Sequence, residues 1–147
     1  MKNEAVDIVL IEDNPNDAEL TMDALQRENL GSHIMLLMDG EEALDYLFSR
    51  GKYKNNKYLE SVKLILLDLK LPKISGLEVL KMVKSNERTK SIPVVVLTSS
   101  AEDYDVIESY KLGANSYIVK PVDFEQFLKT VKEIGLYWLI LNQAPYN

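Results

Sequence analysis

Five short apolar runs alternate with segments of helical spacing, and this alternation constrains the fold of the chain more than any other feature. The runs cover residues 6–11, 34–38, 62–67, 94–97 and 117–119. Each run is short enough to be one strand. Between and after them, apolar residues recur three or four positions apart, as at Leu77, Leu80 and Val83, which is typical of amphipathic helices. The sequence therefore predicts five successive strand–helix units.

The strand sequences IVLI, LILL and VVVL are apolar at every position, as strands covered on both faces require. Strands that alternate with helices form parallel sheets. Pro15 stands where the first helix should begin, and Gly113 stands where the fourth should end. We expect an α/β fold with a doubly wound, five-stranded parallel sheet.

The length of 147 residues is that of an ordinary single domain. We expect one domain over residues 1–147, with a core at about 5–135 and a C-terminal helix extension at about 136–147. The final helix should begin near Asp123. Its positions 127, 131, 134, 138 and 141 form one apolar stripe, whereas Tyr137 and Ile140 lie off it. The polar connection at 51–61 is expected to be a long surface loop.

Composition excludes several classes of function. Without cysteine there are no disulfides, zinc–thiolate sites or cysteine nucleophiles, and the single histidine, His33, is best interpreted as a strand-end residue. The net charge of −6 argues against a general affinity for nucleic acid or anionic lipid. The longest apolar run, 136–141, is far shorter than the ~20 residues of a membrane span. We expect a cytoplasmic protein whose chemistry depends on carboxylates, hydroxyls and lysine.

Polar residues follow four of the five predicted strands. They are Glu12 and Asp13 after the first strand, Asp68 after the third, Thr98 to Ser100 after the fourth, and Lys120 and Pro121 after the fifth. Ligands of open parallel sheets bind at the carboxyl ends of the strands. This edge of the sheet is therefore the candidate site.

The three acids should converge if the first and third strands are neighbours, because paired strands lie about 4.8 Å apart. Carboxylates crowded together repel, and a hard cation such as Mg²⁺ relieves this by taking oxygen ligands. Together with Lys120 and the Thr98 hydroxyl, such a cation would stabilise phosphoryl oxygens on Asp68. Asp68 is thus a candidate nucleophile.

The segments LIEDNPND, LLDLKLPKISGLEVL, VVVLTSS and SYIVKPVD resemble, in order and spacing, the receiver domain of two-component response regulators. The resemblance covers nearly the whole chain. It implies a flavodoxin-like (βα)5 fold with strand order 2-1-3-4-5. It also implies a phosphorelay signalling domain that assists only its own phosphorylation and dephosphorylation, with a partner histidine kinase as phosphodonor.

The resemblance assigns roles to individual residues. Asp68 becomes the phosphoacceptor, Glu12 and Asp13 the acidic pair, Thr98 the switch hydroxyl, and Lys120 the phosphoryl-binding lysine. The implied cofactor is Mg²⁺ or Mn²⁺, held by the acids.

Three further assignments follow from the same resemblance. The backbone carbonyl of Lys70 becomes an additional metal ligand, and Tyr117 becomes the aromatic switch residue on the face of the fourth helix, fifth strand and fifth helix. The bond between Lys120 and Pro121 is expected to be a cis peptide.

The polar loop and long final helix resemble the single-domain regulators that partner bacterial phytochrome histidine kinases. Apolar residues at the end of the final helix either pack on the same domain or join the fourth helix and fifth strand in a homodimer face.

Two other functions compete with this interpretation. One is an aspartyl-phosphate phosphohydrolase of the haloacid-dehalogenase type, but the motif of that family has a second Asp where this chain has Lys70. The other is a receiver-like adaptor that takes no phosphate, against which the complete set of site residues argues.

Overall fold

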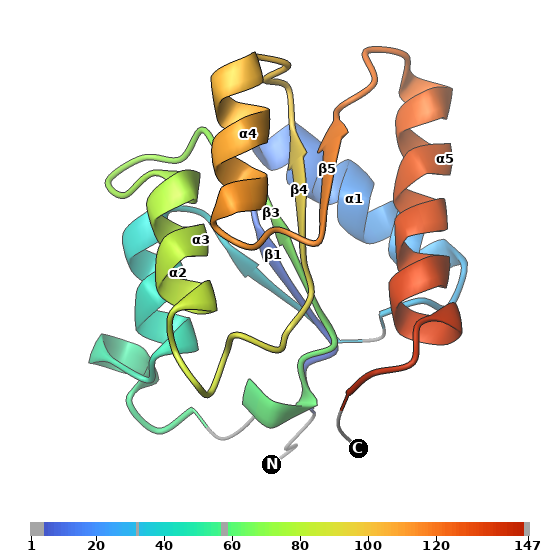
Figure 1. The fold of residues 1–147 in the computed structure, drawn as a ribbon. Helices are drawn as coiled ribbons and strands as arrows, with labels where there is room; N and C mark the ends of the chain where they lie inside the picture. The colour runs from blue at the N-terminus through green and yellow to red at the C-terminus, as the bar shows by residue number, and fades with distance from the viewer. Residues whose placement is uncertain (1–4, 32, 57–58, 146–147) are drawn as a thin grey trace.

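A computed structural model describes residues 5–31, 33–56 and 59–145 of the chain. Within them, the five predicted strands form one parallel sheet in the order β2-β1-β3-β4-β5, which confirms the predicted fold class (Figure 1). The strands are β1 (Ile8–Ile11), β2 (Ile34–Leu37), β3 (Leu64–Leu67), β4 (Val94–Thr98) and β5 (Ser116–Val119).

A helix follows each strand. The helices are α1 (Pro15–Arg27), α2 (Gly40–Leu47), α3 (Gly76–Lys84), α4 (Asp103–Lys111) and α5 (Phe124–Gly135). Helices α1 and α5 cover one face of the sheet, and α2, α3 and α4 cover the other (Figure 1). Four helices begin at a side chain that accepts a hydrogen bond from a backbone N–H of the first turn. These caps are Asn14, Asp39, Ser75 and Asp123.

The core consists of two layers, one on each face of the sheet. Alternate residues of a strand point to opposite faces, so Ile8 and Leu10 pack beneath α1 and α5, while Val9 and Ile11 pack beneath α2 and α3. Strands β1, β3 and β4 are buried along their whole length. Their continuous apolar sequences are therefore explained by burial on both faces.

The connection at 51–61 differs from the predicted surface loop, although residues 57–58 lie outside the described part. It contains two 3-10 turns, η1 (Gly51–Tyr53) and η2 (Leu59–Ser61). Leu59 is only 1% exposed and anchors the connection in the core. The Tyr53 ring packs edge-on against Tyr46, and its hydroxyl donates to Glu42. The polar composition of the segment concealed these two anchors.

The final helix starts after Asp123 as predicted, but it ends in a π-helix, η3 (Leu136–Leu141). Because a π-helix has more residues per turn, the buried stripe shifts after Ile134. Leu139 packs on the core, and Leu141, predicted to be in the stripe, is 67% exposed. The predicted extension also includes residues 146–147, which lie outside the described part.

Among the described residues, none of the helices combines the length and the apolar character that crossing a bilayer would require.

Candidate functional site

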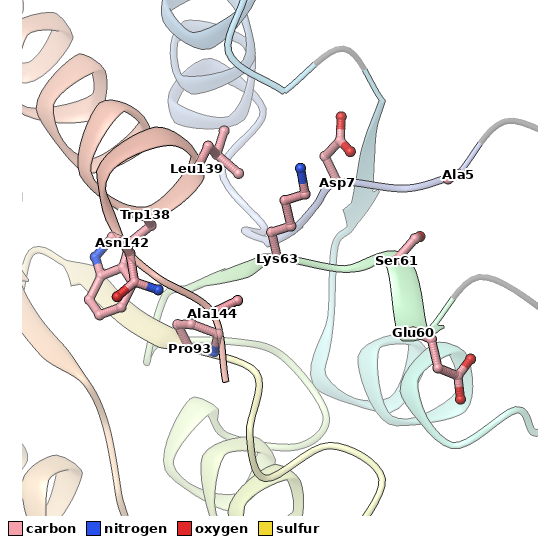
Figure 2. A pocket seen from close by; sticks show the side chains of 10 residues that line it. All are labelled: Ala5, Asp7, Glu60, Ser61, Lys63, Pro93, Trp138, Leu139, Asn142 and Ala144. Carbon is pink, nitrogen blue, oxygen red and sulfur yellow. The ribbon is translucent and has the colours of Figure 1, made fainter. Parts of the chain in front are cut away.

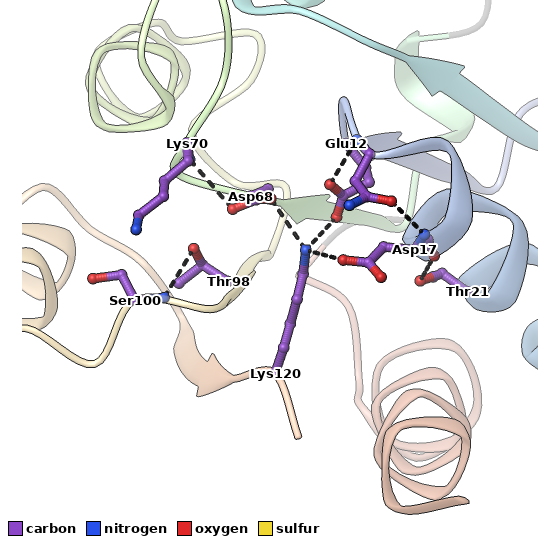
Figure 3. A network of polar contacts seen from close by, with 9 residues as sticks. Glu12, Asp17, Thr21, Asp68, Lys70, Thr98, Ser100 and Lys120 are labelled. Carbon is purple, nitrogen blue, oxygen red and sulfur yellow. Dashed lines mark hydrogen bonds and ion pairs between the residues drawn. The ribbon is translucent and has the colours of Figure 1, made fainter. Parts of the chain in front are cut away.

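Most of the predicted site residues lie together at the carboxyl edge of the sheet, and Figure 3 shows Glu12, Asp68, Lys70, Thr98 and Lys120 there. The register pairs Ile11 of β1 with Leu67 of β3, so the acids that follow these two strands are adjacent. Thr98 of β4 pairs with Val119 of β5, which places Lys120 beside the end of β4. The apolar strands thus carry four polar segments to one place.

The three predicted acids form a cluster. One carboxylate oxygen each of Glu12, Asp13 and Asp68 lies within 4.8 Å of the others. Glu12 and Asp68 are buried, and Asp13 is half-buried. The Glu12 carboxylate also accepts a hydrogen bond from the Asn14 N–H at 3.1 Å. The convergence expected from neighbouring strands is present.

The ammonium group of Lys120 lies beside this cluster. Its Nζ is 2.8 Å from Glu12 Oε1, 3.1 Å from Asp68 Oδ2 and 2.8 Å from Asp17 Oδ2 (Figure 3). Asp17 was missed by the sequence reasoning, because an acid in the first turn of a helix is common there for its interaction with the helix dipole alone. Its position next to the loop that carries Glu12 was the available signal.

The charges of the cluster follow from burial and from these contacts. Burial raises the pKa of Glu12 to about 7, against the opposing effect of Lys120. Burial also acts to raise the pKa of Asp68, but hydrogen bonding from Thr98 and the charge of Lys120 outweigh it and lower that pKa. The carboxylates around Lys120 raise the pKa of its ammonium group despite burial. At neutral pH, Asp68 is therefore a carboxylate and Lys120 a cation.

The acidic cluster fits a divalent metal ion. Glu12, Asp13 and Asp68 bring carboxylate oxygens within 4.8 Å of one another, and Lys120 contacts Glu12, Asp68 and Asp17. Burial raises the pKa of Glu12 despite Lys120, so the charge of Glu12 is incompletely compensated. Carboxylate oxygens are the ligands that Mg²⁺ and Mn²⁺ prefer. A bound divalent cation would offset the repulsion among these carboxylates.

The loop after β3 is held against the site by a close backbone contact at the start of α3. A Cβ atom on Gly76 would lie 2.4 Å from both the Asp68 carbonyl oxygen and the Leu69 Cα, so only glycine fits here. The Lys70 N–H donates to Asp68 Oδ1 at 3.3 Å. The predicted metal-binding role of the Lys70 carbonyl stays a prediction.

Thr98 and Tyr117 are linked through Ser100. Thr98 is fully buried, and its Oγ1 accepts a hydrogen bond from the Ser100 N–H at 3.4 Å. The Tyr117 hydroxyl donates to the Ser100 carbonyl at 2.9 Å, and the Ser100 hydroxyl donates to Asp105 Oδ2 at 2.6 Å. Asp105, which belongs to α4, was also missed. Tyr117, the predicted aromatic switch residue, therefore lies outside the acidic cluster but is linked to Thr98 through Ser100.

The expected cis peptide between Lys120 and Pro121 is wrong, because the described residues contain no cis peptide bond. The trans form of an X–Pro bond is favoured by about 0.5–1 kcal/mol. In the trans form, Lys120 still reaches Asp68 and Glu12.

A cavity of about 400 Å³ lies at the opposite end of the sheet (Figure 2). Its lining includes Asp7, Lys63 and Pro93, which precede three of the strands, and Trp138 and Asn142 from the end of the chain. The predicted site residues do not line it. The chemistry and the cavity thus occupy different ends of the sheet.

Comparison with known families identifies the family of this chain. The model of the response regulator receiver domain matches residues 8–132. The chain belongs to this family. Receiver domains are phosphoacceptor signalling domains, and the predicted family resemblance is confirmed.

Individual receiver proteins are similar over most of this receiver chain. The probable methanogenesis regulatory protein FilR2 of Methanothrix harundinacea is 44% identical over 138 residues, covering 94% of this chain and 86% of FilR2. The response regulator Rcp1 of Synechocystis is 40% identical over 132 residues, which cover 90% of this chain and 88% of Rcp1.

The phosphorylated cyanobacterial phytochrome response regulator RcpA superposes with a TM-score of 0.90 at 39% identity, covering 97% of this chain and 100% of that one. The Mn²⁺-bound form of Rcp1 gives a TM-score of 0.89 at 38% identity, covering 96% and 99%. The receiver is therefore similar in sequence and structure to phytochrome response regulators.

Proposed function

We propose that this receiver accepts a phosphoryl group on Asp68 from the phosphohistidine of a partner histidine kinase. The observation that carries the proposal is the state of Asp68, a buried carboxylate with a lowered pKa that contacts the Lys120 ammonium. A nucleophile must be ionised at neutral pH, and a transferred phosphoryl group needs positive charge beside it. Asp68 meets both requirements.

In the transfer, an Asp68 carboxylate oxygen attacks the phosphorus of the phosphohistidine in line with the leaving nitrogen. The new O–P bond forms as the N–P bond breaks, and its electron pair returns to the imidazole. The Lys120 ammonium compensates charge on the phosphoryl oxygens. Water later attacks the same phosphorus, which releases inorganic phosphate and restores the Asp68 carboxylate.

Mg²⁺ or Mn²⁺ is the proposed cofactor, and it would supply further positive charge to the phosphoryl oxygens when bound. Asp13 and Asp68 would bind it directly, Glu12 would act through a metal-bound water, and the Lys70 carbonyl would complete the protein ligands. The Mn²⁺-bound form of the similar protein Rcp1 supports a divalent metal ion as the cofactor.

The proposed output is a change in the surface formed by α4, β5 and α5. A phosphoryl group on Asp68 would attract the Thr98 hydroxyl, which accepts the Ser100 N–H. Movement of Ser100 would in turn disturb the bond from the Tyr117 hydroxyl to the Ser100 carbonyl. In this role the protein signals by changing shape and turns over no separate substrate.

The proposed phosphodonor is a phytochrome-type histidine kinase. This rests on the likeness to RcpA, and to the bacteriophytochrome response regulator AtBRR at 48% identity and a TM-score of 0.73. Such a kinase uses ATP, so the proposed compartment is the cytoplasm.

A homodimer through α4, β5, α5 and η3 is also proposed, with no direct binding to nucleic acid. Exposed apolar side chains on α4, at the end of β5 and between β5 and the first residue of α5 support it. They are Tyr104, Ile107, Tyr110, Val119, Val122 and Phe124. Size-exclusion chromatography with light scattering should show twice the 16.8 kDa chain mass. A monomer at all concentrations contradicts the dimer.

The phosphoacceptor proposal is tested by intact mass spectrometry after incubation with acetyl phosphate and Mg²⁺. We expect one adduct of about 80 Da, the mass that a phosphoryl group adds. It should be acid-stable, labile to hydroxylamine and absent in Asp68→Asn. Asp105→Asn, which changes an acid on α4, should keep the adduct. Sustained turnover of phosphoesters would favour a phosphohydrolase, and a chain that never gains the adduct would favour an adaptor.

A further inference from the structure

Lys120 has one contact that the proposed chemistry does not use. Of its three carboxylate partners, Glu12 and Asp68 follow strands, and their side chains are only 4% and 8% exposed. Asp17 belongs to α1, and its side chain is 29% exposed. Asp17 therefore contacts the ammonium group from the solvent-exposed side of the site, whereas Glu12 and Asp68 contact it from the buried side.

The position of Asp17 is fixed by the start of α1. Its backbone N–H donates to Asn14 Oδ1 at 3.0 Å, and its carbonyl accepts the Thr21 hydroxyl at 2.7 Å. Pro15 supplies the first helical position, where its fixed φ suits a helix. The helix cap thus orients the Asp17 carboxylate towards Lys120.

The contact limits what Lys120 can offer a phosphoryl group. A lysine ammonium has three N–H donors, and three carboxylates lie within 3.1 Å of Nζ. A phosphoryl group on Asp68 carries about two negative charges, and it needs an N–H that a carboxylate now accepts. Asp17 is the most exposed of these partners, so its contact is the one that exchanges with least desolvation of a buried acid.

We propose that Asp17 is a positioning residue that holds Lys120 in the unphosphorylated receiver and competes with the phosphoryl group for it. The proposal rests on the assignment of Asp68 as phosphoacceptor. It follows that Asp17 weakens the phosphorylated state by retaining an N–H donor and by repelling the phosphoryl oxygens.

Beryllofluoride, a tetrahedral mimic of the phosphoryl group, tests the proposal by ¹⁹F NMR titration at saturating Mg²⁺. Asp17→Asn should bind beryllofluoride about fivefold more tightly, the scale of one partly exposed ion pair. Its affinity for Mg²⁺ alone, measured by calorimetry, should stay equal or fall by up to about threefold, since one negative charge is lost near the cation. A merely structural defect would weaken both affinities.

Two controls separate charge from fold. Asp17→Glu keeps the carboxylate and should restore the wild-type beryllofluoride affinity. Glu19→Gln removes an exposed charge from the same helix and should leave both affinities within about twofold, because a charge in solvent is screened. Asp17→Ser is the substitute variant if Asp17→Asn folds poorly, because helix N-termini also accept serine. It should show the same tighter binding of beryllofluoride.

Equal or weaker beryllofluoride binding by Asp17→Asn and Asp17→Ser, with normal binding by the wild type, overturns the role of Asp17. A wild-type protein that binds no beryllofluoride overturns the Asp68 assignment instead. The two failures are therefore distinguishable.

Discussion

Two partly buried lysines, Lys120 and Lys84, lie at opposite ends of the sheet, and each makes three contacts through its ammonium group. Those of Lys120 are all with carboxylates. Lys84 donates instead to neutral oxygens, at 3.0 Å to the Lys90 carbonyl, 2.8 Å to the Ile92 carbonyl and 3.1 Å to Asn115 Oδ1. The same side chain thus occupies two electrostatically different environments.

The surroundings change the pKa of the two lysines in opposite directions. Burial lowers the pKa of Lys84 to about 8, while carboxylate partners overcome burial and raise the pKa of Lys120. Lys84 ties the end of α3 to the segment before β4 and to Asn115, whose Oδ1 also accepts the Val94 N–H at 2.8 Å. Lys84 therefore connects structural elements, whereas Lys120 holds its positive charge among the acids of the proposed phosphorylation site.

Replacing each lysine with methionine should separate these roles most clearly. Lys120→Met should reduce phosphorylation of Asp68 by about 100-fold or more, because charge stabilisation of this kind is worth that much. In metal-free buffer it should also cost about 3 kcal/mol of unfolding free energy, since it leaves buried carboxylates without a cation. Lys84→Met should be phosphorylated at the wild-type rate. Acetyl phosphate time courses and urea unfolding measure both effects, and equal phosphorylation defects in the two variants contradict the comparison.

Two glycines sharpen the comparison at the level of the backbone. Gly76→Ala should cost about 3 kcal/mol and impair phosphorylation, because the added Cβ would overlap the backbone of Asp68 and Leu69. Gly113, with φ at 107° beside Lys84, is the matched position at the other end. Gly113→Ala should cost about 1–2 kcal/mol from backbone strain and leave phosphorylation intact. Urea unfolding measures the costs; a neutral Gly76→Ala would contradict the close contact.

The stability contribution of Lys84 should depend on pH. Its folded pKa of about 8 lies below the value of 10.5 for an exposed lysine, so between these values the unfolded chain holds a proton that the folded protein has released. Stability from this group therefore rises with pH from about 8 to 10.5 and is lost as pH falls through that window. The unfolding free energy of the wild type should therefore rise relative to that of Lys84→Met by about 1–2 kcal/mol as pH increases through this window. This value is reduced because the lysine is partly exposed. A constant difference contradicts the lowered pKa.

The smallest effect is expected at Tyr117. Tyr117→Phe removes the hydroxyl that donates to the Ser100 carbonyl and should cost about 1 kcal/mol, the usual value of such a bond. Tyr117→Ala should leave phosphorylation of Asp68 intact while weakening the binding of a downstream partner. Thermal unfolding tests the first statement and partner binding by the phosphorylated proteins tests the second. Equal partner binding by wild type and Tyr117→Ala would contradict the switch role.

The sequence was most informative where one physical requirement determined the residue. Continuous apolar strands predicted a sheet covered on both faces, and the order of strands and helices placed Glu12, Asp13 and Asp68 at one edge. Asp17 was not predictable in this way, because its contact with Lys120 joins residues 103 positions apart and depends on the angle at which α1 begins. The shift from Leu141 to Leu139 depends on a change of helix type that an apolar stripe does not encode.

The central claim is that Asp68, among several neighbouring carboxylates, receives the phosphoryl group. Borohydride reduction of the phosphorylated protein converts an aspartyl phosphate to homoserine, and tandem mass spectrometry of peptides then locates that residue. We predict homoserine at position 68 alone. Homoserine at Asp13 or Asp17, or an unmodified Asp68 in a protein that carries the phosphoryl group, would contradict the account.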